Sequence, residues 1–267
     1  MPSAKLSVVS ALLLAVASLL AGCANKSVDP TAKMTTEEIY AQAREEVENV
    51  QYAKAIGLYD KLEGRAAGTP LAQQAQLEKA HAHYKNEEPA QAVATLDRFV
   101  RLHPASPAVD YALYLKGLVN FNEKKGLFSF LVDQDLSERD QQAAKESFAA
   151  FKELVTRFPN SRYTADAQAR MTYIVNSLAM YEVHVARYYF SRGAYLASIN
   201  RAQQAIADYR DAPALEEALH IMVQSYDALQ MPQLREDARR VLETNYPQSR
   251  YISGNSTVRR GPWWKLW

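Results

Sequence analysis

The four residues His103-Pro104-Ala105-Ser106 mark the kind of boundary that decides the fold. Proline cannot extend a helix and disfavours helical geometry in the residue before it, so a helix must end here. The same turn recurs as Phe158-Pro159-Asn160-Ser161 and as Tyr246-Pro247-Gln248-Ser249. We expect the serine of each turn to cap the helix that follows. The chain is therefore predicted to be a series of helices separated by one repeated turn.

The spacing of the prolines gives the length of the repeated unit. Pro70 and Pro104 lie 34 residues apart, and so do Pro213 and Pro247. Only 9 of the 267 residues are glycine, which favours helix along most of the chain. Small residues are expected where paired helices come closest, and these are Ala43, Ala80, Gly117 and Ala186. A 34-residue helix–turn–helix unit closed by proline resembles the tetratricopeptide repeat.

The predicted fold is an all-α, superhelical stack of about five such repeats. The first two repeats occupy about 35–106, the third 107–161, and the fourth and fifth 162–248. The third carries an insert, 124–140, between its two helices, and the first helix of the fourth is lengthened to about 164–192. A generic helical bundle is the alternative, but it does not explain why period, small residues and turns agree.

The N-terminus has the pattern of an export signal. Lys5 precedes an apolar segment from Leu6 to Leu20, and the run Leu20-Ala21-Gly22-Cys23 ends at the only cysteine of the chain. A cationic start, an apolar segment and small residues before a cleavage site are typical of a secretory signal peptide. The apolar segment of about 15 residues is shorter than the roughly 20 that a membrane-spanning helix needs.

The four residues that end at Cys23 resemble the lipobox of bacterial lipoproteins. The resemblance implies that 1–22 is removed, that Cys23 carries an S-diacylglycerol and an N-acyl chain, and that 23–34 is the lipidated tether. Such chains hold a protein on a bilayer at about 0.8 kcal/mol per buried CH₂. Ala24, in place of aspartate, implies the outer membrane by the sorting rules of enteric lipoproteins. The alternative is an ordinary signal peptide with a chance cysteine.

The charge balance excludes a general electrostatic role. Removal of 1–22 takes away Lys5 and no acid, so the 31 basic residues become 30 against 30 acidic ones. A neutral mature domain gives no broad basis for binding nucleic acid or an anionic surface. With its one cysteine acylated the chain can form no disulfide, so the fold must be held by packing alone.

The sequence carries no catalytic motif and no metal motif. We find no nucleophile elbow, no His-Glu-x-x-His and no glycine-rich phosphate loop, and we expect no enzyme activity. The nearest metal-like cluster is Glu78, His81 and His83. His81 and His83 lie two residues apart, about 200° around a helix, so they cannot grip one ion. We therefore expect no metal and no cofactor beyond the covalent lipid on Cys23.

First helices of tetratricopeptide repeats line a concave groove, and resemblance to such proteins assigns groove positions here. The candidates are Tyr40, Arg44, Leu77, His81, Tyr84, Lys85, Tyr111, Tyr114 and Phe121. An aromatic groove bordered by cations suits an extended peptide with aromatic side chains or a free carboxylate. Tyrosine also packs well between repeats, so both uses of these residues remain open.

The C-terminal segment 249–267 is basic and rich in tryptophan. No acid follows Glu243. The candidate anchor residues of this tail are Arg259, Arg260, Trp263, Trp264 and Trp267. Tryptophan with cations suits a membrane interface, an aromatic anchor in a partner protein, or single-stranded nucleic acid. An unstructured terminus is the alternative.

Three stretches carry a more specific resemblance. They are Asp97-Arg98-Phe99 with the segment 101–118, Ser137-Glu138-Arg139-Asp140 with the segment 159–164, and the segment 179–195 with its Arg192-Gly193-Ala194-Tyr195 end. Together with the lipobox and the insert, they are similar to the BamD/ComL family, the lipoproteins of the β-barrel assembly machinery. The resemblance covers about 23–250, nearly all of the mature domain.

The resemblance implies a non-enzymatic factor on the periplasmic face of the outer membrane. Repeats 4 and 5 are expected to hold the last periplasmic domain of a BamA-type barrel protein, with BamE and, where present, BamC nearby. Repeats 1 and 2 are expected to receive the C-terminal signal of unfolded outer membrane proteins. The chain departs from the enteric pattern at Arg65-Ala66-Ala67-Gly68-Thr69, which replaces an aromatic- and proline-bearing turn, and in its tail.

Two other classes of function fit the lipobox and the repeats. One is a pilotin-like lipoprotein for type IV pilus or secretin assembly, or for DNA uptake and competence. Neutral charge and the insert in the third repeat count against it, and we expect no nucleic acid partner. The other is a peptidoglycan-associated scaffold, which no sequence feature supports.

Overall fold

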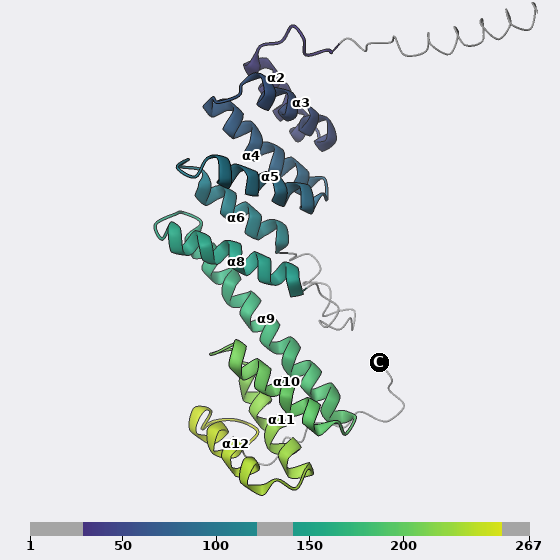
Figure 1. Ribbon diagram of the computed structural model, residues 1–267, viewed down its shortest axis with the longest axis vertical. Coiled ribbons are helices and arrows are strands. Elements are labelled where there is room, and N and C mark those ends of the chain that lie inside the picture. Colours follow the sequence, from purple (N-terminus) through teal and green to yellow (C-terminus); the bar gives the residue numbers. More distant parts are fainter. Residues whose placement is uncertain (1–28, 122–140, 253–267) are drawn as a thin grey trace, which may run out of the picture.

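The computed structural model describes residues 29–121 and 141–252, which form an elongated stack of helices (Figure 1). The signal peptide, Cys23, the insert 124–140 and the tail residues Arg259 to Trp267 lie outside these ranges. The described residues contain ten helices and no strand, so the all-α prediction is confirmed. The helices are α2 (Thr36–Glu48), α3 (Tyr52–Arg65), α4 (Pro70–Lys85), α5 (Pro89–Leu102), α6 (Val109–Asn120), α8 (Gln141–Arg157), α9 (Thr164–Ser191), α10 (Tyr195–Asp208), α11 (Leu215–Ala228) and α12 (Pro232–Asn245).

Consecutive helices pack on one another and form five helix pairs: α2–α3, α4–α5, α6–α8, α9–α10 and α11–α12. α9 is the longest of the described helices at 28 residues, and it connects the two ends of the stack (Figure 1). In the ranges that the structure covers, no helix is both long enough and apolar enough to cross a membrane.

Small residues lie where paired helices come closest, as the sequence predicted. Ala43, Ala80 and Ala186 are fully buried. A Cβ atom on Gly117 would lie 2.3 Å from the ring of Phe151, so any larger residue would force the ring to move. Ser147 also donates a hydrogen bond of 2.9 Å from its Oγ to the Gly117 carbonyl. Gly117 therefore sets the spacing of α6 and α8.

The serines of the repeated turns act differently from the prediction. The N-cap of α9 is Tyr163, whose N–H donates to Ser161 Oγ at 3.2 Å, so Ser161 lies two residues before the cap. The Ser161 hydroxyl donates to Oδ2 of Asp110, which lies in the first turn of α6, at 2.7 Å. Ser249 donates likewise to Glu216 Oε1, at 2.6 Å. Both serines therefore tie the end of a repeat back to the start of its own first helix, and Ser161 is not the N-cap of α9.

The buried side chains form three cores. The N-terminal core joins repeat 1 to the start of α4 and includes Ile39, Tyr59 and Ala75. The middle core joins repeats 2 and 3 to the first half of α9, as far as Leu178. The C-terminal core begins at the next residue, Ala179, and joins the second half of α9 to α10, α11 and α12. α9 is therefore shared between two cores.

The outer face of α12, the last described helix, is polar. The second helices α3, α5, α10 and α12 each have 14 residues and can be compared position by position. At positions 5 and 12, α5 places Val93 and Val100 in the middle core, and α10 places Ile199 and Ile206 in the C-terminal core. In α12 these positions are Glu236 and Glu243, which are exposed. A polar outer face is what the terminal repeat of a soluble stack needs.

Candidate functional site: the face of the first helices

The predicted groove residues of repeats 1 and 2 surround one carboxylate that the sequence analysis did not assign to the groove. Glu78 of α4 is half-buried, and burial raises its pKa while Arg44 opposes the rise. Tyr40 and Tyr59 also have raised pKa values, first because of burial and then because of the negative charge of Glu78. We call Tyr40, Arg44, Tyr59, Glu78 and Tyr111 the Glu78 cluster.

Hydrogen bonds and rings hold this cluster together. Gln74 of α4 donates from Nε2 to the Tyr40 hydroxyl at 2.6 Å, which links α4 to α2. The rings of Tyr40 and Tyr59 lie 6.3 Å apart. The Tyr59 hydroxyl is buried and has no hydrogen-bond partner in the described structure. Burial and Glu78 raise the pKa of Tyr111 to about 12, so this phenol is a neutral donor at neutral pH.

The histidine and the cation of α4 extend the site toward its C-terminal end. Burial lowers the pKa of His81, and the charge of Lys85 lowers it further, so the imidazole is neutral at neutral pH. Lys85 is exposed and lies 5.8 Å from the ring centre of Tyr84. His83 is paired with Glu88 and not with this site, because its Nδ1 lies 2.6 Å from Glu88 Oε2. Among the residues with described positions, no three His, Cys, Asp or Glu side chains come together as metal ligands.

The candidates of the third repeat are occupied by contacts with repeat 4. The Tyr114 ring stacks on Tyr163 at 4.6 Å, and its hydroxyl donates to Asp166 Oδ2 at 2.7 Å. Tyr111 also lies 5.8 Å from the Tyr163 ring. Phe121 meets Tyr173 edge-on at 5.6 Å. For these residues the structure shows the packing between repeats that the sequence left open.

Leu77 does not lie on the groove surface. It is only 8% exposed and belongs to the middle core. Glu78, the next residue, shares its helix face with Gln74, His81 and Lys85 by helical spacing. That spacing was the signal in the sequence that could have placed Glu78 in the site. The buried Tyr59 comes from a second helix, so no spacing pattern within the first helices could have revealed it.

The exposed, unshared part of the site is therefore its repeat 1–2 half. It offers the cations Arg44 and Lys85, the partly buried Glu78 and several aromatic rings. Such a surface can accept an extended peptide: rings contact apolar side chains, cations bind carboxylates, and Glu78 can accept a backbone N–H. The predicted anchor Cys23 and the tail candidates Arg259 to Trp267 lie outside the described residues and add nothing to this geometry.

Comparison with known proteins assigns the chain to a family. A family model described as "YfiO: Outer membrane lipoprotein" matches residues 32–242. The chain is 46% identical to the outer membrane protein assembly factor BamD of Neisseria meningitidis serogroup B, over 93% of this chain and 95% of that protein. It is 46% identical to the BamD of Neisseria gonorrhoeae, over 92% of each chain, and 33% identical to that of Vibrio cholerae, over 85% of this chain and 94% of the relative. The chain therefore belongs to the YfiO family of outer membrane lipoproteins.

Proposed function

We propose that this protein is a non-enzymatic component of the machinery that assembles β-barrel proteins into the outer membrane. The observation that carries the proposal is the identity of 46%, over nearly the full length of both chains, with relatives named as assembly factors. The stack of helix pairs supports it, because such stacks present extended surfaces for several proteins at once.

Tyr40, Arg44 and Glu78 of the Glu78 cluster form the substrate-binding surface in this proposal, together with the neighbouring Tyr84 and Lys85. An unfolded barrel strand exposes backbone N–H and C=O groups, alternating apolar side chains and, at its end, a carboxylate. The Tyr40 and Tyr84 rings receive the apolar side chains, and Arg44 and Lys85 receive the carboxylate. No chemical step is needed, so the protein acts by binding and handing over its substrate.

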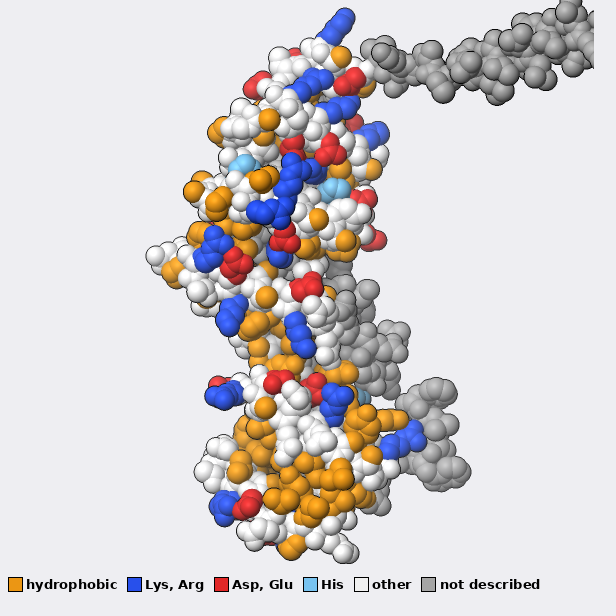
Figure 2. Space-filling model, in the orientation of Figure 1, with side chains coloured by type: hydrophobic (Ala, Val, Ile, Leu, Met, Phe, Trp, Pro, Cys, Tyr) orange, Lys and Arg blue, Asp and Glu red, His pale blue; other side chains and the backbone are white. Residues whose placement is uncertain are grey.

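Repeats 4 and 5 dock the partner proteins in the proposal. Large apolar side chains with substantial exposure gather there: Tyr188, Leu196, Met231, Leu234 and Val241. Figure 2 shows hydrophobic side chains collected over the end of the molecule that holds α10, α11 and α12. A surface of this kind marks a protein interface. The expected partners are a BamA-type barrel protein through its periplasmic domains, with BamE and BamC beside it.

Lipid on Cys23 completes the proposal by holding the protein on the periplasmic face of the outer membrane. The first experiment is therefore purification of a tagged copy from outer membranes in mild detergent, followed by mass spectrometry of its partners. A stoichiometric barrel protein with periplasmic repeat domains is expected. Secretin or pilus components in its place would contradict the proposal and support the pilotin-like alternative.

A binding experiment tests the substrate surface separately. A short labelled barrel-strand peptide ending in phenylalanine is titrated with protein, as the free acid and as the C-terminal amide. Arg44→Gln with Lys85→Gln is expected to weaken binding of the acid about tenfold, the loss of roughly one charge-assisted hydrogen bond. The variant Lys54→Gln with Arg101→Gln removes the same charge elsewhere and is the control. Equal affinity of both variants for the acid would exclude this surface.

A further inference from the structure

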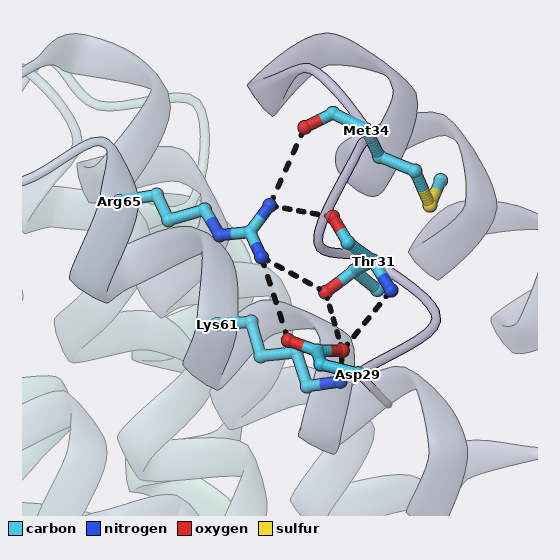
Figure 3. A network of polar contacts seen from close by, with 5 residues as sticks. All are labelled: Asp29, Thr31, Met34, Lys61 and Arg65. Carbon is cyan, nitrogen blue, oxygen red and sulfur yellow. Dashed lines mark hydrogen bonds and ion pairs between the residues drawn. The ribbon is translucent and has the colours of Figure 1, made fainter. Parts of the chain in front are cut away.

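The segment that precedes the first helix is bound to the fold. Residues 29–34, which we call the N-terminal strap, lie against α3 (Figure 3). Asp29 Oδ1 accepts hydrogen bonds from the Thr31 N–H at 3.0 Å and from Lys61 Nζ at 2.6 Å. Arg65 Nη1 donates to the Thr31 carbonyl at 2.7 Å and to the Met34 carbonyl at 3.3 Å. Arg65 Nη2 also lies 3.4 Å from Asp29 Oδ2, so one guanidinium contacts both ends of the strap.

Burial accompanies this network. Thr31 is only 1% exposed, and Met34 packs against the N-terminal core. The strap also closes on itself, because the Ala32 N–H donates to the Asp29 carbonyl and the Met34 N–H to the Thr31 carbonyl, both at 3.0 Å. Pro30 restricts the backbone of the strap, which lowers the entropy lost when it is ordered. Individual exposed ion pairs contribute little, but here they act together with buried backbone contacts.

Comparison of the second helices shows what the strap replaces. In α5 the tenth residue is Arg98, which reaches back to Glu63 of the preceding repeat at 3.4 Å. In α3 the tenth residue is Lys61, and it reaches back to Asp29 of the strap. The strap therefore occupies the place that a preceding repeat would occupy. It covers one end of the stack, as the glutamates of α12 close the other.

We propose that the strap fixes the lipid attachment point to α3 and so makes repeat 1 the membrane-facing surface of the protein. This inference rests on the proposed lipid at Cys23. From Cys23 to Asp29 there are six residue-to-residue steps, which span at most about 20 Å at 3.3–3.6 Å per step. Without the strap the first fixed residue would be Thr36, and the reach would be about 45 Å. The partner of this surface is the lipid bilayer.

The substrate surface is thereby placed near the lipid as well. Tyr40 and Arg44 of α2 follow the strap within a few turns of helix, whereas α12 lies at the far end of the stack (Figure 1). A flexible tether would let the stack rotate freely over the membrane. A tether fixed at Asp29 holds the repeat 1–2 end close to the bilayer, where a barrel strand enters it.

Energy transfer in reconstituted vesicles tests this placement. Because Cys23 is the only natural cysteine and carries the lipid, an introduced cysteine is the single free thiol for a donor dye. Gly57→Cys labels α3, where an added Cβ meets nothing within 4 Å, and Gln233→Cys labels the exposed start of α12. The acylated full chain is placed in phosphatidylethanolamine–phosphatidylglycerol vesicles that carry headgroup-linked acceptors. Transfer from position 57 is expected to exceed that from position 233 at least about twofold, given the short reach.

Variants of the strap separate its role from that of the lipid. Lys61→Gln with Arg65→Gln is expected to lower transfer from position 57 by about half and to speed amide exchange at Ala32 and Met34 about tenfold. Lys54→Gln with Arg101→Gln, which removes the same charge, is expected to change neither. Equal transfer from the two positions in acylated protein would overturn the membrane-facing assignment. Unchanged transfer and exchange in the strap variant would overturn the role of the strap.

Mass spectrometry of the reconstituted protein distinguishes failure of the proposed function from failure of the membrane-facing inference. Absence of acyl mass on Cys23 would remove the anchor itself and overturn both proposals. Acylated protein with a distant repeat 1 would overturn the present inference alone and leave the assembly function standing.

Discussion

The middle core and the C-terminal core share α9 but are filled in different ways. Four of the fifteen buried residues of the middle core are alanine, against eight of fifteen in the C-terminal core. The middle core is filled by large side chains such as Phe99, Phe151 and Leu154. In the C-terminal core alanines such as Ala202 and Ala218 are fully buried between the helices. α9 contributes both small and large side chains to each core, with Ala167 and Leu178 in the middle core and Ala186 and Phe190 in the C-terminal core.

Both regions bury a serine that donates to the backbone of the paired helix, and in the middle core Ser147 donates to the Gly117 carbonyl at 2.9 Å. In the C-terminal core Ser198 donates from Oγ to the Ala186 carbonyl at 2.8 Å, a contact that needs close backbones. At the junction of repeats 1 and 2, Lys79 reaches Asp60 at 2.8 Å and Glu63 at 2.6 Å. Lys116 and Asp97 repeat this pairing at the next junction, at 2.5 Å. A charged pair also joins repeats 4 and 5, where Arg187 Nη2 lies 2.6 Å from Glu217 Oε1. The two regions therefore differ in their apolar side chains and not in the use of charged pairs between repeats.

The largest expected effect is loss of a large side chain from the middle core. Phe151 is fully buried and its ring lies 6.1 Å from Tyr114 and 6.3 Å from Phe121. Phe151→Ala is expected to lower the free energy of unfolding by about 4 kcal/mol, because it leaves a cavity beside Gly117. Urea unfolding followed by circular dichroism measures this. The exposed Leu102→Ala is the control, and an equal loss there would show that the core assignment is wrong.

The next effect tests the charged junction of repeats 1 and 2. Lys79→Ala leaves the carboxylate of Glu63 largely buried, with only the longer contact to Arg98 at 3.4 Å. The expected loss is about 2–3 kcal/mol, the cost of a buried charge without its main partner. Lys79→Met with Glu63→Leu is expected to recover at least half of it. A double variant as unstable as the single one would show that the pair matters for more than charge.

A smaller effect is expected from the opposite change in the C-terminal core. Ala202→Leu adds a large side chain where Ala202 is fully buried, and the expected loss is about 2 kcal/mol from overpacking. Ala207→Leu on the same helix is exposed and is expected to change stability by less than about 0.5 kcal/mol. The same unfolding measurement applies. A neutral Ala202→Leu would mean that the alanines do not set the distance between helices.

The smallest effect is a local dependence on pH at the strap. The hydrogen bond from Lys61, followed by those from Thr31, lowers the pKa of Asp29 from 3.8 to about 2. A lowered carboxyl pKa stabilises the folded state above the unfolded value and loses that contribution as pH falls from about 4 toward 2. Amide exchange at Ala32 and Met34, referred to the intrinsic rate at each pH, is expected to accelerate only in that window. In Asp29→Asn the acceleration should be absent, and a parent protein without it would contradict the role of Asp29.

The sequence revealed the fold because its signals are local. Proline ends a helix wherever it stands, and alanine or glycine at a helix crossing is visible as a small residue in a periodic pattern. The role of the turn serines was not predictable in the same way, since Asp110 and Ser161 are separated by the whole third repeat. The polar face of α12 could have been read from the sequence, because Glu236 and Glu243 stand where valine or isoleucine stands in α5 and α10.

The candidate site was predictable only in part, for the same reason. Helical spacing correctly indicates which residues share a face, but burial depends on the neighbouring helix. Leu77 and Glu78 are adjacent in the chain, yet one lies in the core and the other among the groove residues. Residues 29–34 fall within the predicted tether, 23–34, and local sequence could not reveal the strap because its partners Lys61 and Arg65 lie more than 30 residues away.

The sharing of α9 by two cores has a mechanical consequence. A helix of 28 residues is about 42 Å long and, without proline or glycine in its interior, behaves as a stiff rod. A tilt of about 5° at one end displaces the other end by about 4 Å. A protein bound to repeats 4 and 5 can therefore alter the packing around Tyr163 and Tyr114 without any hinge between the two halves. The two halves of the molecule then move together as a rigid unit, which pivots where α9 passes from the middle core at Leu178 to the C-terminal core at Ala179.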